Sequence, residues 1–418
     1  MRHDVPVTGP CWDVRRVALV GVSAIALAAC GAPQHVAPPE PEFVSGSRAE
    51  PAVQVFVDGG GETAAPIDPE DVVAEGADAD GMVLVDDAGN AVPNGSGWEQ
   101  FAGAIASTLG SVNRAVSVAV MVDGQLVHAS ASGERVAGDP VDVTDRFRIA
   151  SISKTITAIV TMQLVEDGTL TLDDPVGDLL ALHLGSETID PDARSITVRE
   201  LLSHTAGFPQ HEGTFFSVGA ASCVDAARTG LASGVASGGY RYSNMGYCVL
   251  GTLIEAVTGK TYERVVRERL LVPLGISGMR LVGTYELGPD EVDHAPTPGR
   301  NFMETLAAAG SWNATPSDLV LILNSIDPDT PGWKALSPDT ARSMRISIDG
   351  VPESGYGLGL IKYGADFGHK GTLQNTHSMV LRQDNGVTWA VTVAGNYPSS
   401  SGTLRGIVKT ALAQAFPS

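Results

Sequence analysis

The sequence predicts an α+β fold, in which strands from both ends of the folded region form one antiparallel sheet and helices lie between them. An apolar strand pattern occurs near the start of that region at Val116–Val122, and further strands are expected near its end, around Ser378–Leu381 and over Val387–Ala394. Two long, largely apolar helices, Ile152–Glu166 and Asn244–Val257, stand between these strands. This order indicates a sheet closed by the two ends of the domain, with a mostly helical insertion.

The remaining elements follow in chain order. Apolar residues at helical spacing over Trp98–Val112 predict a helix before the sheet. After the first strand, Asp123-Gly124 suits a type I′ turn, which indicates a hairpin with Leu126-Val127. The first long helix is apolar on most sides and stops at Asp167-Gly168, so it should be buried. A terminal helix is expected over Gly402–Phe416.

The chain begins with the outline of an export signal. Arg15-Arg16 precede an uncharged run, Val17–Ala29, that is shorter than the ~20 residues needed to span a bilayer. The text Leu27-Ala28-Ala29 before Cys30 resembles the bacterial lipobox, and this resemblance implies cleavage before Cys30 and a diacylglyceryl group on its sulfur. We therefore expect a signal peptide over residues 1–29 and attachment to the membrane through lipid on Cys30. A secreted protein with an incidental cysteine is the alternative.

Residues 30–96 are predicted to form a disordered tether. They are rich in Pro, Ala, Gly, Glu and Asp, as in Pro38–Glu42 and Gly59–Glu62. Such a segment has too little apolar surface to offset its ordering entropy. Two short apolar runs, Val53–Val57 and Met82–Val85, could still form strands and dock part of this arm on the domain. The folded domain itself is expected over residues 97–418.

The composition excludes some classes of function. The 418 residues are 43% hydrophobic and 18% charged, as in an ordinary globular enzyme. Lys and Arg number 27 against 48 Asp and Glu, a formal net charge of -21, so a nucleic-acid backbone would be repelled. Neither the cysteine spacing nor its surroundings suggest a metal site, and we expect no cofactor.

The chemistry is predicted to begin at Ser151-Ile152-Ser153-Lys154. A hydroxyl and an amine three residues apart at the start of a helix lie on one face, about one turn apart. The helix N-terminus adds positive potential at Ser151, and the apolar neighbours Ile149, Ile156 and Ile159 disfavour the charged form of the amine, which can then accept a proton. Alone, the pattern more often marks an N-cap serine beside an unrelated lysine.

Two further segments change that balance. Tyr242-Ser243-Asn244 opens the second apolar helix, and Gly368-His369-Lys370-Gly371-Thr372 comes just ahead of a strand. In this order the three segments match S-x-x-K, a polar-x-Asn element and K-T-G. The chain thus resembles the class C beta-lactamase-like and penicillin-binding-protein-like serine hydrolases, which implies a beta-lactamase/transpeptidase-like fold. Four other segments carry the same resemblance: Phe147–Ala150, Gly168–Pro175, Leu201–Phe208 (with His-Thr-Ala-Gly) and Tyr356–Gly359.

The resemblance implies a role for each site residue. Ser151 would attack a carbonyl carbon, and Lys154 with Tyr242 would take its proton and pass it to the leaving group. Tyr242 would then activate water for deacylation. Backbone N–H groups of Ser151 and Thr372 would hold the oxyanion, and Asn244 would bind the substrate amide or Lys154. His204 is interpreted as structural, since a buried imidazole hydrogen-bonded to a loop carbonyl needs no catalytic explanation.

The third motif departs from the family pattern. His369 stands where lactamases and carboxypeptidases usually have lysine, and a neutral imidazole attracts a substrate carboxylate poorly. His369 and Gly371 are expected to line the substrate-binding side, and strong beta-lactamase activity is not expected. Lys370 should point to the other face of the strand. An alignment that gives Lys370 the lysine role is the alternative.

Cys223 and Cys248 remain as an even pair once Cys11 is removed with the signal and Cys30 is lipidated. In an oxidising compartment they could form a disulfide around the Tyr242 loop, which would stabilise the fold by roughly 3 kcal/mol. A buried free thiol at Cys248 is the alternative.

These observations predict an extracytoplasmic, lipid-anchored, monomeric serine hydrolase that cleaves an ester or peptide amide bond through an acyl-enzyme. Its substrate would be a small ester or peptide, one source being the cell wall. A peptidoglycan DD-carboxypeptidase with weak beta-lactamase activity, and a catalytically silent envelope-binding protein of the same fold, are the alternatives.

Overall fold

The computed structural model describes residues 95–417, except 186–188, 209–213, 216–220, 234, 236–238, 297–301 and 347–354. The predicted signal peptide, the lipidation site Cys30 and the tether up to residue 94 lie outside the described residues. In the part of the chain that is described, no helix combines the length and the apolar character that crossing a membrane requires.

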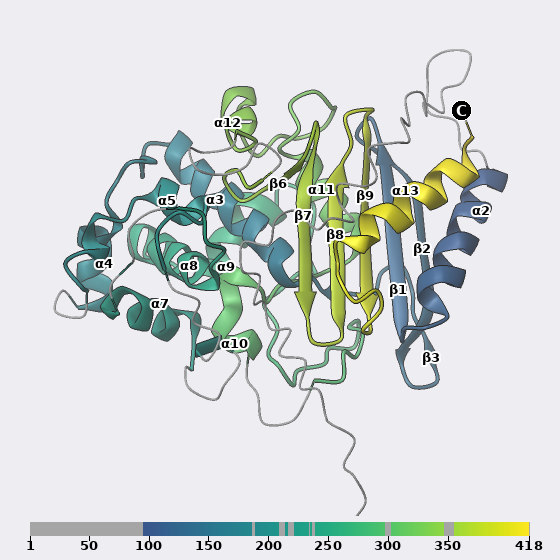
Figure 1. Ribbon diagram of the computed structural model, residues 1–418, viewed down its shortest axis with the longest axis horizontal. Helices are drawn as coiled ribbons and strands as arrows, with labels where there is room; N and C mark the ends of the chain where they lie inside the picture. Colours follow the sequence, from purple (N-terminus) through teal and green to yellow (C-terminus); the bar gives the residue numbers. More distant parts are fainter. Residues whose placement is uncertain are drawn as a thin grey trace, which may run out of the picture. The chain divides into compact units, whose positions relative to one another are not determined.

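The larger sheet has seven strands in the order β3-β2-β1-β9-β8-β7-β6, and every neighbouring pair is antiparallel (Figure 1). The strands are β1 (Ala115–Val122), β2 (Gln125–Val136), β3 (Asp139–Pro140), β6 (Ile361–Tyr363), β7 (Asp366–Leu373), β8 (Thr376–Arg382) and β9 (Val387–Ala394). The central pairing of β1 with β9 joins the start of the domain to its end, with Ala115 opposite Ala394 and Val122 opposite Val387. The predicted closure of the sheet by both ends of the domain is therefore confirmed.

Helices cover both faces of this sheet. On one face, α2 (Gly95–Ile105) and α13 (Thr403–Ala415) pack on a core that includes Val118 and Val120. On the other face, α11 (Pro316–Asn324) packs beside the alternate residues Ala119 and Met121. Because successive strand side chains point to opposite faces, β1, which is buried along its whole length, contributes to both cores.

The helical region lies beside the β7 end of the sheet, around the buried helices α3 and α8 (Figure 1). Its α-helices are α3 (Ser153–Glu166), α4 (Val176–Leu184), α5 (Val198–Leu202), α7 (Cys223–Ala232), α8 (Asn244–Thr258), α9 (Tyr262–Val266) and α10 (Phe302–Leu306). Shorter turns include η2 (Ala150–Ile152), η4 (Ala193–Ser195), η5 (Arg267–Leu271) and η6 (Ala307–Ala309), and α12 (Pro338–Ser343) follows later in the chain. This arrangement confirms the predicted α+β fold with an inserted helical region.

Two details differ from the sequence analysis. The segment Gly368–Thr372 was expected just ahead of a strand, but it lies within β7. The hairpin strand expected at Leu126-Val127 extends to Val136. Both strands contain many glycine and polar residues, which hide the apolar alternation that marks a strand.

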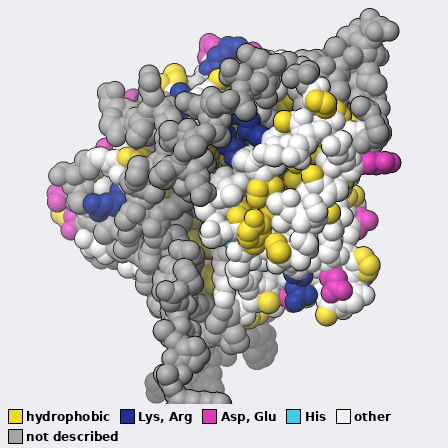
Figure 2. Space-filling view, turned by 45° about the vertical axis from the view of Figure 1, so that its right-hand side comes forward, with side chains coloured by type: hydrophobic (Ala, Val, Ile, Leu, Met, Phe, Trp, Pro, Cys, Tyr) yellow, Lys and Arg dark blue, Asp and Glu magenta, His cyan; other side chains and the backbone are white. Residues whose placement is uncertain are grey.

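Some apolar side chains remain on the surface, among them Val112, Leu126 and Leu182. Figure 2, which turns the right-hand side of Figure 1 forward, shows hydrophobic side chains on the described part of that face, interspersed with uncharged and charged ones. Scattered exposure of this kind is usual for a folded protein.

Candidate active site

The structure brings the predicted nucleophile and its predicted base together. Ser151 lies in η2 and Lys154 in the first turn of α3, and a hydrogen bond of 3.1 Å joins Ser151 Oγ to Lys154 Nζ. Ser151 is partly exposed, whereas Lys154 is fully buried. The hydroxyl can therefore meet a substrate while the amine stays away from bulk water.

Two acceptors orient the buried amine. Lys154 Nζ donates to Asn244 Oδ1 at 2.7 Å and to the carbonyl oxygen of Ala309 at 2.9 Å. Because both oxygens accept only, they fix two N–H bonds of the amine. In a neutral amine the lone pair is then left to accept the proton of the Ser151 hydroxyl, as a general base must.

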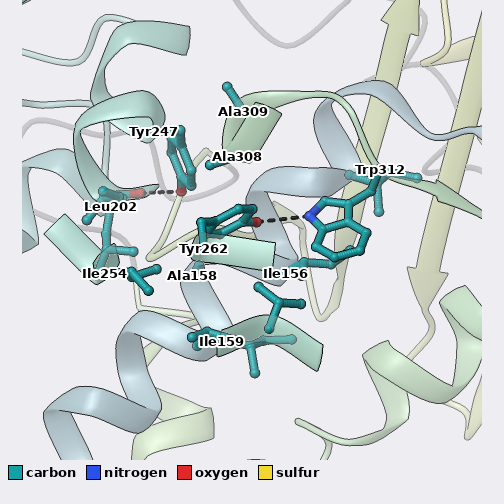
Figure 3. Close-up of a cluster of buried hydrophobic side chains, with 14 of the residues drawn as sticks. Ile156, Ala158, Ile159, Leu202, Tyr247, Ile254, Tyr262, Ala308, Ala309 and Trp312 are labelled. Atoms are coloured by element: carbon teal, nitrogen blue, oxygen red, sulfur yellow. Dashed lines mark hydrogen bonds between the residues drawn. The ribbon is translucent and has the colours of Figure 1, made fainter. Parts of the chain in front are cut away.

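Polar contacts under α3 hold these groups in place. Thr157 Oγ1 donates to the carbonyl of Ala308, in the same short turn as Ala309, and is also hydrogen-bonded to the phenol of Tyr262. That phenol accepts a hydrogen bond from Trp312 Nε1 at 2.9 Å (Figure 3). These buried hydrogen bonds hold the turn that contains Ala309, whose carbonyl orients Lys154.

The backbone just before the nucleophile is held from two sides. Ile149 N–H donates to the carbonyl of Trp312, and the Ile149 carbonyl accepts from Ser378 Oγ at 2.8 Å. Phe147 and Arg148 form β4, which pairs with β5 (Asn313–Ala314). Ala150 has a positive φ of 48°, a conformation that L-residues other than glycine seldom adopt. The sharp turn that presents Ser151 is thus set by its surroundings.

Tyr242 lies beside the amine. Its side chain is buried, and Lys154 Nζ is 4.7 Å from the centre of its ring. Tyr242 directly precedes Ser243, the N-cap of α8, whose Oγ accepts a hydrogen bond from Gly246 N–H. The second motif therefore delivers both Tyr242 and Asn244 to Lys154, and the role of Tyr242 in proton transfer stays a prediction.

His369 is fully engaged by the protein. Its Nδ1 donates to the carbonyl of Lys370 at 2.6 Å, so its Nε2 accepts from the phenol of Tyr356 at 2.9 Å. Burial, with a smaller contribution from the charge of Lys154, lowers the pKa of His369 to about 3. His369 is consequently neutral at physiological pH, and direct contact between its ring and substrate remains a prediction.

Gly371 allows β7 to approach the nucleophile. A Cβ atom at this position would lie 2.4 Å from the carbonyl oxygen of Ile149 and 2.9 Å from the Cβ of Ala150. The next residue, Thr372, donates from Oγ1 to Ser401 Oγ at 2.9 Å. The strand that carries the predicted oxyanion donor Thr372 therefore packs against the turn that carries Ser151.

Cys223 and Cys248 form a disulfide, as predicted. The bond joins α7 to α8, and Cys248 lies one turn beyond Asn244. It therefore ties down the helix whose first residue contacts Lys154. Among the described residues, no group of three or more His, Cys, Asp and Glu side chains is placed to hold a metal ion.

Sequence analysis gave no role to Ala309 or Tyr356. Ala309 acts through its backbone carbonyl, which leaves no signature in the side-chain sequence. Tyr356 lies in the Tyr-Gly-Leu-Gly segment that supported the family resemblance, and this was the one available signal.

A serine at the start of a helix is hydrogen-bonded to a buried lysine, and this pair lies beside a sheet that is closed by both ends of the domain. This combination defines a serine hydrolase of the beta-lactamase and penicillin-binding type. The chain belongs to the Beta-lactamase family, which it matches over residues 104–413. The family resemblance inferred from the motifs is therefore confirmed, and with it the expectation of a serine hydrolase.

Individual relatives carry different names. The chain is 32% identical over 290 residues to "Penicillin-binding protein 4" of Amycolatopsis lactamdurans, covering 61% of this chain and 74% of the relative. It is 28% identical over 321 residues to "Lovastatin esterase" of Penicillium rubens, covering 60% and 79%. Several other curated relatives are matched over less than two thirds of their own length.

Among solved structures, D-amino acid amidase from Ochrobactrum anthropi SV3, complexed with L-phenylalanine, aligns with a TM-score of 0.63. Its sequence identity is 25%, and the alignment covers 76% of this chain and 98% of the amidase. A penicillin-binding protein, an esterase and an amidase thus occur together among the proteins that this chain resembles.

Proposed function

We propose that this chain hydrolyses esters or amides through an acyl-enzyme on Ser151, with Lys154 and Tyr242 as the proton carriers. The observation that carries this proposal is the 3.1 Å hydrogen bond between Ser151 Oγ and the buried amine of Lys154. The contacts of that amine with Asn244 and Ala309 support it, because they orient the nitrogen toward the hydroxyl.

The reaction proceeds in two halves. Ser151 Oγ bonds to the substrate carbonyl carbon while its proton passes to Lys154 and Tyr242, and then to the departing alcohol or amine. Water next adds to the ester carbon with Tyr242 as base, which releases the acid and restores the Ser151 hydroxyl. Backbone N–H groups of Ser151 and Thr372 are the proposed donors to the oxyanion in both halves.

We propose further that the preferred substrates lack a carboxylate next to His369. The imidazole is neutral and both its nitrogens bond to protein groups, so it offers no fixed positive charge. The names of an esterase and an amidase among the relatives support this preference. The penicillin-binding relative favours the second candidate, a DD-carboxypeptidase with weak beta-lactamase activity.

Labelling with a fluorophosphonate tests the nucleophile. The wild-type chain should be labelled, and Ser151→Ala should lose labelling and about 10³-fold or more of its ester hydrolysis. Ser107→Ala is a matched control, because this exposed serine lies on the far helical turn η1 (Ala106–Gly110). Persistent labelling of the Ser151→Ala variant would contradict the proposal. If the wild type shows neither labelling nor hydrolysis, the result favours a catalytically silent binding protein.

A pair of substrates tests the carboxylate preference. An acyl-D-alanyl-D-alanine and its terminal amide have nearly the same shape and differ mainly in the final charge. The ratio of kcat/KM for cleavage of the D-Ala-D-Ala bond that both contain therefore reports mainly that charge. We expect the amide to be cleaved at least as fast. A preference of more than about tenfold for the carboxylate, or stable capture of labelled penicillin, would support the carboxypeptidase instead.

Export and lipid attachment at Cys30 also belong to the proposal, as does a monomeric state. The apolar run Val17–Ala29, which ends in Leu-Ala-Ala directly before Cys30, supports export and lipid attachment. Incorporation of labelled palmitate by the wild type, and its loss in Cys30→Ala, is the expected result. Equal labelling of the two chains contradicts lipidation at this residue, and light scattering of the detergent-solubilised protein gives the oligomeric state.

A further inference from the structure

His204 occupies a strained backbone position at the end of α5. Its N–H donates to the carbonyl of Leu201, and the following Thr205 N–H donates to that of Glu200. This pair of bonds is the Schellman pattern, in which the residue at the position of His204 adopts a left-handed conformation and is usually glycine. His204 has φ 61° and is buried. A strained residue that glycine could replace without strain suggests that the side chain has a use.

The side chain and backbone of His204 hold the two amides that flank Tyr242. Its carbonyl oxygen accepts from Arg241 N–H at 2.8 Å, and its Nδ1 accepts from Ser243 N–H at 3.1 Å. Its ring lies 4.3 Å from the ring of Tyr242, centre to centre. His204 therefore restrains the backbone on both sides of Tyr242, through the N–H groups of Arg241 and Ser243, and its ring lies against the ring of Tyr242.

The contact with Ser243 also completes the cap of α8. In a capping box, the side chain at the third helical position bonds back to the N–H of the N-cap residue. In α8 that third position is Gly246, which has no side chain to supply the acceptor. The imidazole of His204 supplies this acceptor from another part of the chain. The start of α8 is therefore fixed, and with it the position of its first residue, Asn244.

The bonding pattern fixes the protonation of His204. Because Nδ1 accepts a hydrogen bond, the proton of the neutral ring resides on Nε2. This atom is buried without a hydrogen-bond partner among the described residues, and the ring lies 4.5 Å from that of Tyr356, tilted by 61°. Burial of the ring is the main cause that holds the pKa of His204 well below its usual value. Nδ1 of His204 can thus accept a hydrogen bond across the physiological pH range.

We propose that His204 is a positioning residue, which fixes Tyr242 and Asn244 against Lys154 by accepting the Ser243 N–H and bracketing the Tyr242 backbone. This inference rests on the proposed roles of Tyr242 and Lys154. It assigns to His204 no contact with substrate and no proton transfer.

Two substitutions separate the acceptor from the bulk of the ring. His204→Leu keeps comparable volume but removes the acceptor, and we expect the kcat of its folded fraction to fall about 30-fold with KM within about threefold of wild type. His204→Asn keeps an acceptor near the place of Nδ1 and tolerates a positive φ, so it should recover kcat to within about fivefold of wild type. A purely structural role predicts equal losses in the two variants after correction for the folded fraction, and that result overturns the proposal.

A double-substitution cycle tests the route through Tyr242. If His204 acts by placing the phenol, adding His204→Leu to Tyr242→Phe should lower kcat by less than about threefold more. Full additivity overturns the inference. Full activity of Tyr242→Phe alone instead removes the proposed role of Tyr242, so the two failures can be told apart.

A spectroscopic measurement covers the case in which His204→Leu does not fold. The ¹⁵N spectrum of wild-type imidazole groups should show His204 with unprotonated Nδ1 and protonated Nε2, unchanged from pH 5 to pH 8. A protonated Nδ1 at neutral pH would mean that Ser243 N–H has no acceptor there, which overturns the proposal.

Discussion

Removal of the disulfide between Cys223 and Cys248 should cost stability by an amount that the structure allows to be calculated. The bond closes a loop of 25 residues. The chain-entropy relation then gives about 3.5 kcal/mol of lost stability at 25 °C, because the unfolded chain gains the freedom that the cross-link denied it. With an unfolding entropy of about 2.1 cal/mol/K for each of ~320 domain residues, this corresponds to a fall in Tm of about 5 °C.

The assay is urea unfolding of the wild type, Cys223→Ala, Cys248→Ala and the double variant. Each single variant should lose nearly the full amount, because either substitution opens the loop, and the double variant should lose little more. Wild type treated with a reductant supplies a matched control without any substitution and should resemble the double variant. A double variant within about 0.5 kcal/mol of the oxidised wild type would refute the calculation, as would losses in the single variants that simply add.

Three further substitutions or conditions probe other parts of the molecule. Gly371→Ala should lower kcat at least about tenfold, because the added Cβ pushes β7 away from the nucleophile. Gly406→Ala is the control, because a Cβ there meets open space, and its kcat should be unchanged. Equal effects on kcat in the two variants contradict the argument that Gly371 allows β7 to approach Ser151. Tyr262→Phe should lower the free energy of unfolding by about 1–3 kcal/mol, because Trp312 Nε1 loses its buried acceptor; an unchanged urea midpoint argues against this. His369 has a pKa of about 3 in the folded state, below its value in the unfolded state, so the unfolded state binds the extra proton first as the pH falls. The free energy of unfolding should therefore decrease as the pH drops from about 6.5 toward 3, by about 2 kcal/mol at pH 5. In His369→Gln this contribution should vanish from the pH dependence of urea unfolding.

Part of the candidate site could be predicted because each of its motifs is a short run of neighbouring residues. Ser151 and Lys154 meet through one helical turn, and Asn244 meets Lys154 as the first residue of an apolar helix. The pairing of Cys223 with Cys248 followed from counting the cysteines that remain once the predicted signal peptide and the predicted lipidation site are set aside.

What could not be predicted depends on the backbone or on tertiary contacts. The Ala309 carbonyl that orients Lys154 has no side-chain signature. The hydrogen bond between Tyr356 and His369 joins the segment before β6 to β7, and no periodicity links the two residues. His204 was interpreted as structural, and only the folded structure shows that its Nδ1 accepts a hydrogen bond from Ser243 N–H. Sequence periodicity reports which face of an element is buried, but not which atom it meets.

The pairing of β1 with β9 has a consequence for how the protein is made. During synthesis β1 and β2 emerge early and can form their hairpin, while the other neighbour of β1 is produced only after nearly all of the domain. Until then the β1 edge presents open backbone hydrogen-bonding groups to any strand that approaches. Pairing over such a sequence distance is slow to form. Nascent chains and fragments that stop before Val387 should therefore depend on chaperones, and hydrolytic activity should arise only after the ribosome has passed β9.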